Sequence, residues 1–147
     1  MKIRKAVIPA AGFGTRFLPV TRSVPKVLLP VLDTPSLQLI VEEAASSGIE
    51  DVIVVISEGQ EAIVRYFRRM PRLEATLRRR GHLDVLRRME TIAAMVNVRH
   101  VVQEQPLGLG HAVLMARQAV GDEPFAVILP DDLIWAPKPT IGAMMEV

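Results

Sequence analysis

The chain has 147 residues, of which 50% are hydrophobic and 23% are charged, a composition that supports a folded core and excludes a wholly disordered chain. The absence of cysteine excludes disulfides, thiolate metal ligands and a cysteine nucleophile. No apolar run approaches the roughly 20 residues of a membrane helix, and the apolar stretch behind the basic start is too short for a signal peptide. We therefore expect a single-domain cytoplasmic protein.

The net charge of +2 conceals an uneven distribution. Residues 65–88 contain nine of the 18 basic residues and only two acidic ones, so this segment is formally +7 and the remainder −5. We favour a solvated face or a subunit contact in a homo-oligomer. Docking of an acidic surface is a second interpretation. Nucleic-acid binding is the third, because the accompanying aromatics, Tyr66 and Phe67, lie on a face expected to be buried.

The first half of the chain alternates strand and helix patterns. A short apolar run predicts a strand at 6–9. A glycine- and proline-rich segment follows at 10–35, far too long for an idle connection. Apolar residues at helical spacing predict a helix over 37–45 that Gly48 ends. The β-branched run at 51–56 is the clearest strand.

The same alternation continues in the second half. A helix is predicted over 63–70, with Met70 on its apolar face and a row of arginines on one other face: Arg65, Arg68, Arg69 and Arg72. One or two helices follow across 73–95, broken near Gly81, so that residues 60–95 form an arginine-rich helical excursion. A strand at 98–102, a helix at 110–119, a strand at 125–129 and a helix beginning after Pro139 complete the pattern.

This alternation predicts an α/β fold, with a Rossmann-like doubly wound, mostly parallel sheet and flanking helices. Ligands of such sheets bind outside the carboxyl ends of the strands, near the switch in strand order. Three segments follow strand ends: the loop after the first strand, residues 103–110 after the third, and residues 130–132 after the fourth. We expect the chemistry of the protein in these three places.

The loop after the first strand has the residues of a phosphate site. Gly12 and Gly14 allow a close backbone approach to an anion, and Arg16 adds a planar, permanently charged group. The third glycine of a dinucleotide-binding fingerprint and the Gly-Lys-Ser/Thr of a P-loop are both missing. A tight turn with an exposed arginine is the alternative. Further along the loop, prolines should hold Lys26 in place near a phosphate, unless it is a solvated surface lysine.

Three stretches together resemble the sugar-1-phosphate nucleotidylyltransferases, and within them the bacterial UTP–glucose-1-phosphate uridylyltransferases. The first is Gly-Phe-Gly-Thr-Arg-Phe-Leu-Pro at 12–19, with Thr21, Pro25-Lys26 and Leu28-Leu29-Pro30 behind it. The others are residues 103–113 and 121–133, in the family's order and spacing. One departure is Val27, where these enzymes usually have Glu. The chain is also about half the family's length, and the sugar pocket, a second metal-binding aspartate and a lysine for the sugar phosphate belong to the other half.

The resemblance implies a role for each matching residue. The backbone around Ala10, Ala11 and Gly12 would lie against the base and ribose, and that of Gly14 and Thr15 would cradle the triphosphate. Arg16 would bind the leaving pyrophosphate, and Lys26 the phosphate at which displacement occurs. Gln103 and the amide of Gly108 would read the uracil edge. Asp131 would bind Mg²⁺, with Asp132 the less secure candidate.

Elementary chemistry supports these implied roles. An amide side chain offers both a donor and an acceptor to a base edge. A carboxylate at the end of an apolar strand is costly unless a cation accompanies it, although the two aspartates could instead cap the next helix. We expect His111, at the start of a helix, to bond to nearby backbone rather than to the sugar or phosphate, and not to act as a general base.

The implied reaction converts UTP and α-D-glucose 1-phosphate to UDP-glucose and pyrophosphate with Mg²⁺. Residues 1–147 would then be one nucleotide-binding α/β unit, the front of a longer nucleotidyltransferase domain. Thymidylyl transfer from dTTP on the same fold is the near alternative. A non-catalytic UTP-binding fragment without a sugar site is the other.

Overall fold

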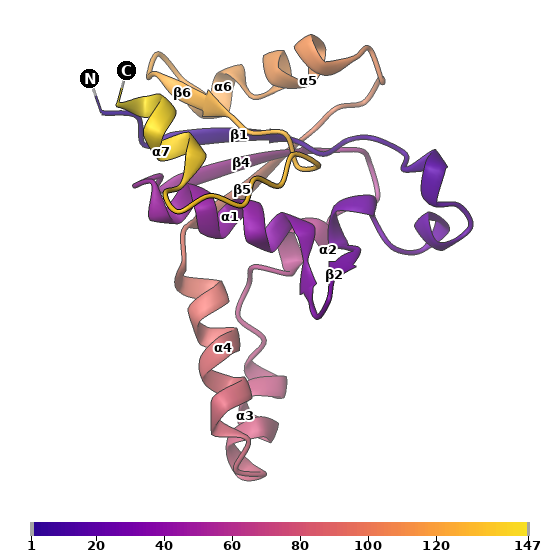
Figure 1. Ribbon diagram of the computed structural model, residues 1–147. Coiled ribbons are helices and arrows are strands. Elements are labelled where there is room, and N and C mark those ends of the chain that lie inside the picture. Colours follow the sequence, from indigo (N-terminus) through magenta and orange to yellow (C-terminus); the bar gives the residue numbers. More distant parts are fainter. Residues whose placement is uncertain (1, 147) are drawn as a thin grey trace.

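A four-stranded parallel sheet forms the centre of the protein in the computed structural model, which describes residues 2–146 (Figure 1). The strands are β1 (Lys5–Pro9), β4 (Asp51–Ile56), β5 (Asn97–Val102) and β6 (Phe125–Val127), in the order β5-β4-β1-β6. Each neighbouring pair is parallel, with Lys5 opposite both Asp51 and Phe125. The strand order reverses at β1, which is the switch point expected of a doubly wound sheet.

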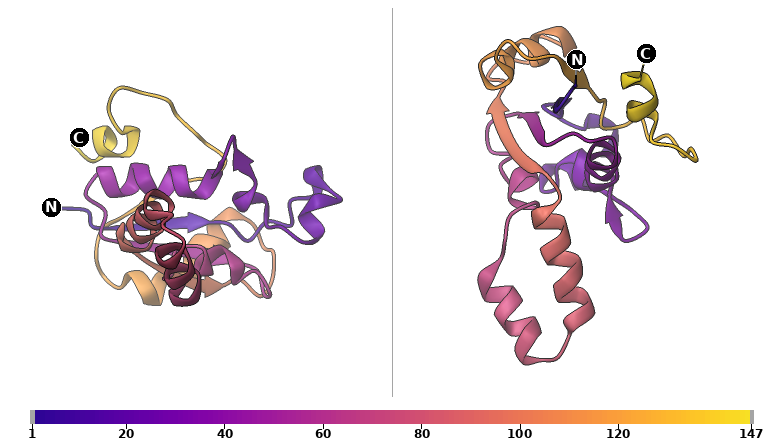
Figure 2. Two further views of the ribbon diagram at one scale, coloured as in Figure 1. Left: turned by 90° about the horizontal axis from the view of Figure 1, so that it is seen from below. Right: turned by 90° about the vertical axis from the view of Figure 1, so that its left-hand side faces the viewer.

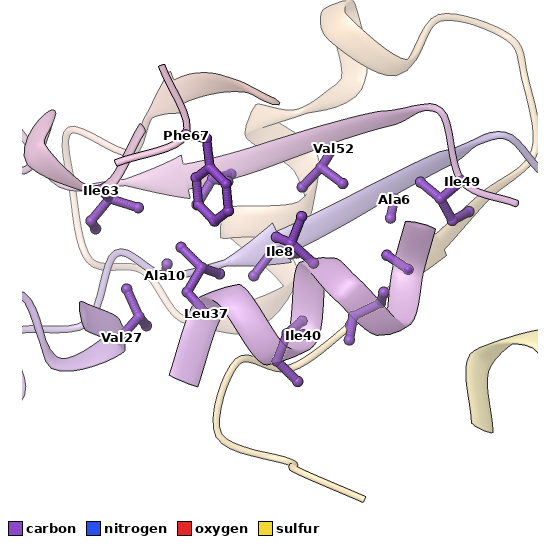
Figure 3. Close-up of a cluster of buried hydrophobic side chains, with 14 of the residues drawn as sticks. Ala6, Ile8, Ala10, Val27, Leu37, Ile40, Ile49, Val52, Ile63 and Phe67 are labelled. Atoms are coloured by element: carbon purple, nitrogen blue, oxygen red, sulfur yellow. The ribbon is translucent and has the colours of Figure 1, made fainter. Parts of the chain in front are cut away.

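Helices cover both faces of this sheet (Figures 1 and 2). On one face α1 (Ser36–Ser46), the short α2 (Ala62–Arg65) and α7 (Thr140–Met145) contribute to the core, and on the other face lie α5 (Leu109–Met115) and α6 (Arg117–Val120). The sides of β1 alternate accordingly. Ala6 and Ile8 pack with α1, as Figure 3 shows, and Val7 packs with α5 and α6. Burial on both faces explains why the strand is an unbroken apolar run.

The long segment between β1 and α1 contains short turns and one small hairpin. Three 3-10 turns, η1 (Thr15–Phe17), η2 (Val20–Arg22) and η3 (Lys26–Leu28), are followed by the two-residue strands β2 (Pro30–Val31) and β3 (Thr34–Pro35). The segment extends beyond the carboxyl end of β1 (Figure 1). It is therefore an ordered structure at the predicted ligand-binding edge.

The arginine-rich excursion is a pair of helices, α3 (Pro71–Arg79) and α4 (Leu83–Ala94), which project from the sheet (Figures 1 and 2). The predicted break is confirmed, because Gly81 lies between them with a φ of 74°. We call residues 71–94 the α3–α4 hairpin.

The single helix predicted over 63–70 is wrong. Helix α2 ends at Arg65, and Pro71 starts α3 as its first residue, a position that suits proline. Met70 lies before that start and is 42% exposed instead of buried. The four arginines predicted to share one helical face are therefore distributed over α2, the connection and α3.

Two other boundaries differ from the sequence prediction. The helix predicted over 110–119 is interrupted at Ala116, which ends α5 and precedes α6. Strand β6 ends at Val127 rather than at residue 129, although the Ile128 N–H still donates to the Val7 carbonyl at 3.0 Å. The remaining strands and the helices α1 and α7 lie where the pattern predicts them. Within residues 2–146, no helix is both long enough and apolar enough to cross a membrane.

Candidate functional site

The loops that follow the strands meet at the carboxyl edge of the sheet and form two adjoining clefts. One, of about 470 Å³, is lined by residues after β1 and β6, with Lys26 and Asp131 among them. The other, of about 280 Å³, is lined by Gln103 and Gly108 together with the loop after β1. Pro9, Gly12 and Leu109 line both clefts. The two clefts therefore adjoin over the end of β1, and we call them together the groove.

The loop after β1 is hydrogen-bonded to the end of β4 and to the residue that follows it. The Ala10 N–H donates to the Val55 carbonyl at 2.7 Å, and the Ser57 hydroxyl donates to the Ala11 carbonyl at 2.6 Å. Ala10 and Ala11 are buried, whereas Gly12 is exposed on the groove side. Backbone from the first strand thus lines the floor of the groove without bulky side chains.

Gly14 is required at its position for two physical reasons. Its φ of 62° is left-handed, and a Cβ there would lie 2.9 Å from Thr21 Cγ2 and 3.1 Å from Lys26 Cβ. The Thr21 hydroxyl donates to the Gly14 carbonyl at 2.8 Å. The glycine therefore packs the start of the loop tightly against the segment that carries Lys26.

Lys26 and Asp131 face each other across the larger cleft. Lys26 Nζ lies 3.1 Å from Asp131 Oδ2, although the two residues are 105 positions apart in the chain. The ammonium also lies 5.8 Å from the centroid of the Phe17 ring. The hydrogen bond from Lys26, aided by the charges of Lys26 and Arg16, lowers the pKa of Asp131 against a smaller opposing effect of burial. Asp131 is therefore an ionised carboxylate at neutral pH.

Gln103 and Gly108 lie together at the smaller cleft. Gln103 is only 7% exposed, and its side-chain nitrogen Nε2 donates to the Gly108 carbonyl at 3.2 Å. Gly108 has a φ of 94°, which favours glycine, and precedes α5. His111 Nδ1 lies 2.9 Å from Gln103 Nε2. The expectation that His111 bonds to nearby backbone is wrong in this respect, because its partner is the side chain of Gln103.

Four predicted residues, Gly14, Thr15, Arg16 and Asp132, lie beside the groove rather than in its lining. Thr15 and Arg16 belong to η1 and are exposed, and Asp132 is exposed behind Asp131. Arg16 is nonetheless close enough for its charge to lower the pKa of Asp131. The lining itself includes the other predicted residues Ala10, Ala11, Gly12, Gln103, Gly108, Lys26 and Asp131.

Sequence reasoning did not single out three residues that shape the groove. Phe17 and Leu109 line it, and Ser57 fixes the Ala11 carbonyl from the end of β4. The signal for Ser57 was its place directly after the clearest strand. Leu109 occupies a position between two glycines, which carries no chemical signal of its own.

Comparisons with known proteins give one consistent result. A family model described as "Nucleotidyl transferase" matches residues 5–145. The "UTP--glucose-1-phosphate uridylyltransferase YngB" of Bacillus subtilis is 49% identical over 146 residues, which are 99% of this chain and 49% of that protein. The "UTP--glucose-1-phosphate uridylyltransferase 2" of Staphylococcus saprophyticus is 48% identical over 145 residues, which are 99% of this chain and 50% of that protein. The chain thus spans about half the length of these curated relatives.

Solved structures agree with the fold. A "UTP-bound UGPase" from Acinetobacter baumannii is 46% identical and superposes with a TM-score of 0.84, covering 88% of this chain and 46% of that one. A UDP-glucose pyrophosphorylase "complexed with UDP-glucose" is 38% identical with a TM-score of 0.80, covering 99% of this chain and 52% of that one. The predicted doubly wound α/β fold is confirmed.

Proposed function

The chain belongs to the nucleotidyl transferase family, and from that premise we propose that residues 1–147 form the nucleotide-binding α/β unit of a UTP–glucose-1-phosphate uridylyltransferase. The resemblance found in the sequence is confirmed at the level of the family. The observation that carries the proposal is the groove. It offers an amide side chain at one end and a paired cation and carboxylate at the other.

The proposed reaction is a displacement at phosphorus. A phosphate oxygen of α-D-glucose 1-phosphate attacks the α-phosphorus of UTP, a new P–O bond forms, and the bond to the β-phosphate oxygen breaks. UDP-glucose and pyrophosphate are the products. The attacking phosphate is already ionised, so the reaction needs no general base. Orientation of the reactants and stabilisation of charge are the tasks left to the protein.

We assign the uracil to the smaller cleft. Gln103 and the amide of Gly108 would meet the base edge, and two observations support this: both residues line the smaller cleft, and the φ of 94° at Gly108 favours a residue without a side chain. The buried alanines and Gly12 leave room for a flat base and a ribose along the backbone. This arrangement suits a pyrimidine nucleotide.

The triphosphate belongs to the larger cleft in this assignment. The ammonium of Lys26 would contact the α-phosphate, and the tight loop around Gly14 and Thr15 would hold Arg16 near the leaving pyrophosphate. Both cations can donate charge-assisted hydrogen bonds to phosphate oxygens, and these are about twice as strong as neutral ones. They would stabilise the negative charge that moves to the pyrophosphate.

Asp131 is the candidate ligand for Mg²⁺, with Asp132 next to it. Mg²⁺ in such sites takes one or two carboxylates and completes its shell with substrate phosphates and water. The residues fit this pattern, since Asp131 is ionised and 58% of its side chain is exposed. Residues 2–146 contain no group of three or more acidic or histidine side chains able to hold a metal without such help. The ion would supply charge neutralisation of the phosphates when bound.

Calorimetry of the chain with UTP, with and without Mg²⁺, tests the proposal. We expect saturable binding that weakens when Mg²⁺ is removed or when Asp131 is replaced by asparagine. A parallel titration with dTTP separates the uridylyl from the thymidylyl alternative. Pyrophosphate release on adding glucose 1-phosphate distinguishes a catalytic unit from a nucleotide-binding one. No measurable affinity for either nucleotide would contradict the proposal.

A further inference from the structure

Gln103 directs both hydrogens of its side-chain amide at acceptors within the chain. Nε2 lies 3.2 Å from the Gly108 carbonyl oxygen and 2.9 Å from His111 Nδ1. An NH₂ group has two hydrogens, so these two contacts use its full donor capacity. Gly108 precedes α5 and His111 lies in its first turn, and therefore a single element holds both acceptors.

The two contacts together determine which ring nitrogen of the neutral His111 imidazole carries the proton. If the amide were reversed, its oxygen would face the Gly108 carbonyl oxygen, and two acceptors would repel each other. The NH₂ group therefore faces Gly108. Since the same nitrogen also contacts His111, Nδ1 must accept a hydrogen bond, and the proton of the neutral ring lies on Nε2.

The opposite side of the amide is left open. Within residues 2–146, Gln103 Oε1 has no hydrogen-bond partner, and no fully buried side-chain oxygen or nitrogen is left without one. The oxygen is therefore not fully enclosed, and the cleft that Gln103 lines is the one assigned above to the base. With its two hydrogens engaged, the Gln103 amide has only its oxygen left to offer to a ligand.

We propose that His111 is a positioning residue that sets base specificity by holding Gln103 with its oxygen toward the groove. This inference rests on the proposed nucleotide site. A fixed acceptor matches a base whose ring nitrogen N3 carries a hydrogen, as in uracil and thymine. It opposes cytosine, whose N3 is itself an acceptor. The contact does not distinguish uracil from thymine, which differ only in a methyl group at C5.

Two substitutions at His111 separate this role from a structural one. In His111→Leu the acceptor for Gln103 is lost. In His111→Asn it is retained, because the side-chain oxygen of asparagine lies two bonds from Cβ, as Nδ1 does in histidine. The dissociation constants of UTP and CTP are measured by calorimetry with Mg²⁺ for both variants and the unaltered chain. The ratio of the two constants is the decisive quantity, since general damage to the cleft weakens both nucleotides alike.

We expect the unaltered chain to prefer UTP over CTP by at least about tenfold, the cost of one unpaired buried polar group. His111→Leu should lower this preference by about fivefold, through weaker UTP binding with little change for CTP, and His111→Asn should restore most of it. An unchanged ratio in His111→Leu, or equal weakening of both nucleotides, would overturn the role of His111. If the unaltered chain bound no nucleotide, the proposed function would fail as well.

Nitrogen NMR of the unaltered chain gives a second test, which needs no variant to fold. The ring resonances of His111 should show a proton on Nε2 and none on Nδ1, and the Gln103 amide hydrogens should exchange slowly with solvent. A proton on Nδ1 would overturn the inference.

Discussion

The groove and the α3–α4 hairpin both contain ion pairs, but the pairs in the two regions are formed differently. In the groove, Lys26 and Asp131 come from opposite ends of the chain and meet at a cleft. In the hairpin, Glu90 pairs with Arg78 at 3.6 Å and with Arg69, just before the hairpin, at 3.5 Å, and Asp84 pairs with Arg87 within α4. These pairs join residues that are close in sequence, whereas Arg88 of α4 also pairs with the distant Asp33 at 3.4 Å.

This difference indicates why charge content alone was a poor guide to function. The groove has few charges, and the fold brings them together at a strand end where a ligand can enter. The hairpin has six of the 14 arginines of the chain, and two of them, Arg78 and Arg87, pair with acidic residues of the hairpin itself. Its buried Glu74 pairs with Arg69, just before the hairpin. A ligand site is thus indicated by the position of a charge relative to the sheet rather than by the number of charges.

Removing the cations in and beside the groove should produce the largest effect. We expect Lys26→Ala to weaken Mg²⁺–UTP binding by roughly thirtyfold, or about 2 kcal/mol, because a charge-assisted hydrogen bond to phosphate is lost. Arg16→Ala should weaken it by roughly tenfold, since η1 is more exposed than the cleft wall. Calorimetry at a fixed salt concentration measures both.

Matched controls come from outside the groove. Lys2→Ala removes an exposed lysine that pairs with Glu50 at 3.7 Å, and Arg79→Ala removes an exposed arginine of the hairpin. Both should leave UTP affinity within about twofold of the unaltered chain. Comparable losses in these controls would show that the groove has no special role and that net charge governs binding.

Glycine replacements should give the next largest effect and test how tightly each region is built. Gly14→Ala should destabilise the protein by about 1–2 kcal/mol from the left-handed backbone alone, with a further cost from the clash with Thr21. Gly81→Ala in the hairpin has a similar φ of 74° but open space around the added Cβ. Urea unfolding should therefore rank Gly14→Ala as the more damaging change. Equal losses would mean that the packing against Thr21 and Lys26 is unimportant.

Much of the fold was predictable because the central strands are buried on both faces. The β-branched run at 51–56 was the clearest strand in the sequence, and β4 has those bounds. The groove was also predictable in outline, since strand ends in such sheets are its expected place. The side-chain contacts within the groove could not be predicted from local propensity. The contact between Gln103 and His111 depends on how the loop before α5 turns, and no spacing rule specifies that turn.

The segment just before the hairpin shows where sequence periodicity fails. Ile63, Phe67 and Met70 recur at helical spacing, yet Pro71 starts a new helix and the chain changes direction before it. Ile63 and Phe67 still reach the core, while Met70 is exposed. The helical spacing predicted the burial of Ile63 and Phe67 correctly and that of Met70 wrongly. Periodicity carries no information about where one helix ends and another begins along a different axis.

Acidification gives the smallest predicted effect and tests whether the hairpin charges serve stability. Glu74 accepts hydrogen bonds from Arg69 Nε at 2.8 Å and from the Met70 N–H at 3.0 Å. The bonds from Arg69, more than the backbone bond and nearby charges, lower the pKa of Glu74 from 4.5 to about 2. A carboxyl group whose pKa is lower in the folded protein than in the unfolded chain stabilises the folded state. This stabilisation is complete at pH values above the pKa in the unfolded chain. That contribution is lost as the pH falls from 4.5 toward 2.

We therefore expect Glu74→Gln to lower the melting temperature near neutral pH by on the order of a few degrees. The melting temperatures of the variant and the unaltered chain should converge as the pH approaches about 2. Asp84→Asn is the matched control, because its ion pair with Arg87 is on the exposed side of α4 and should change stability by less than about 0.5 kcal/mol. UTP affinity should be the same in both variants. If Glu74→Gln weakened UTP binding without changing the melting temperature, the hairpin would contribute to ligand binding, and the distinction drawn between the two regions would be wrong.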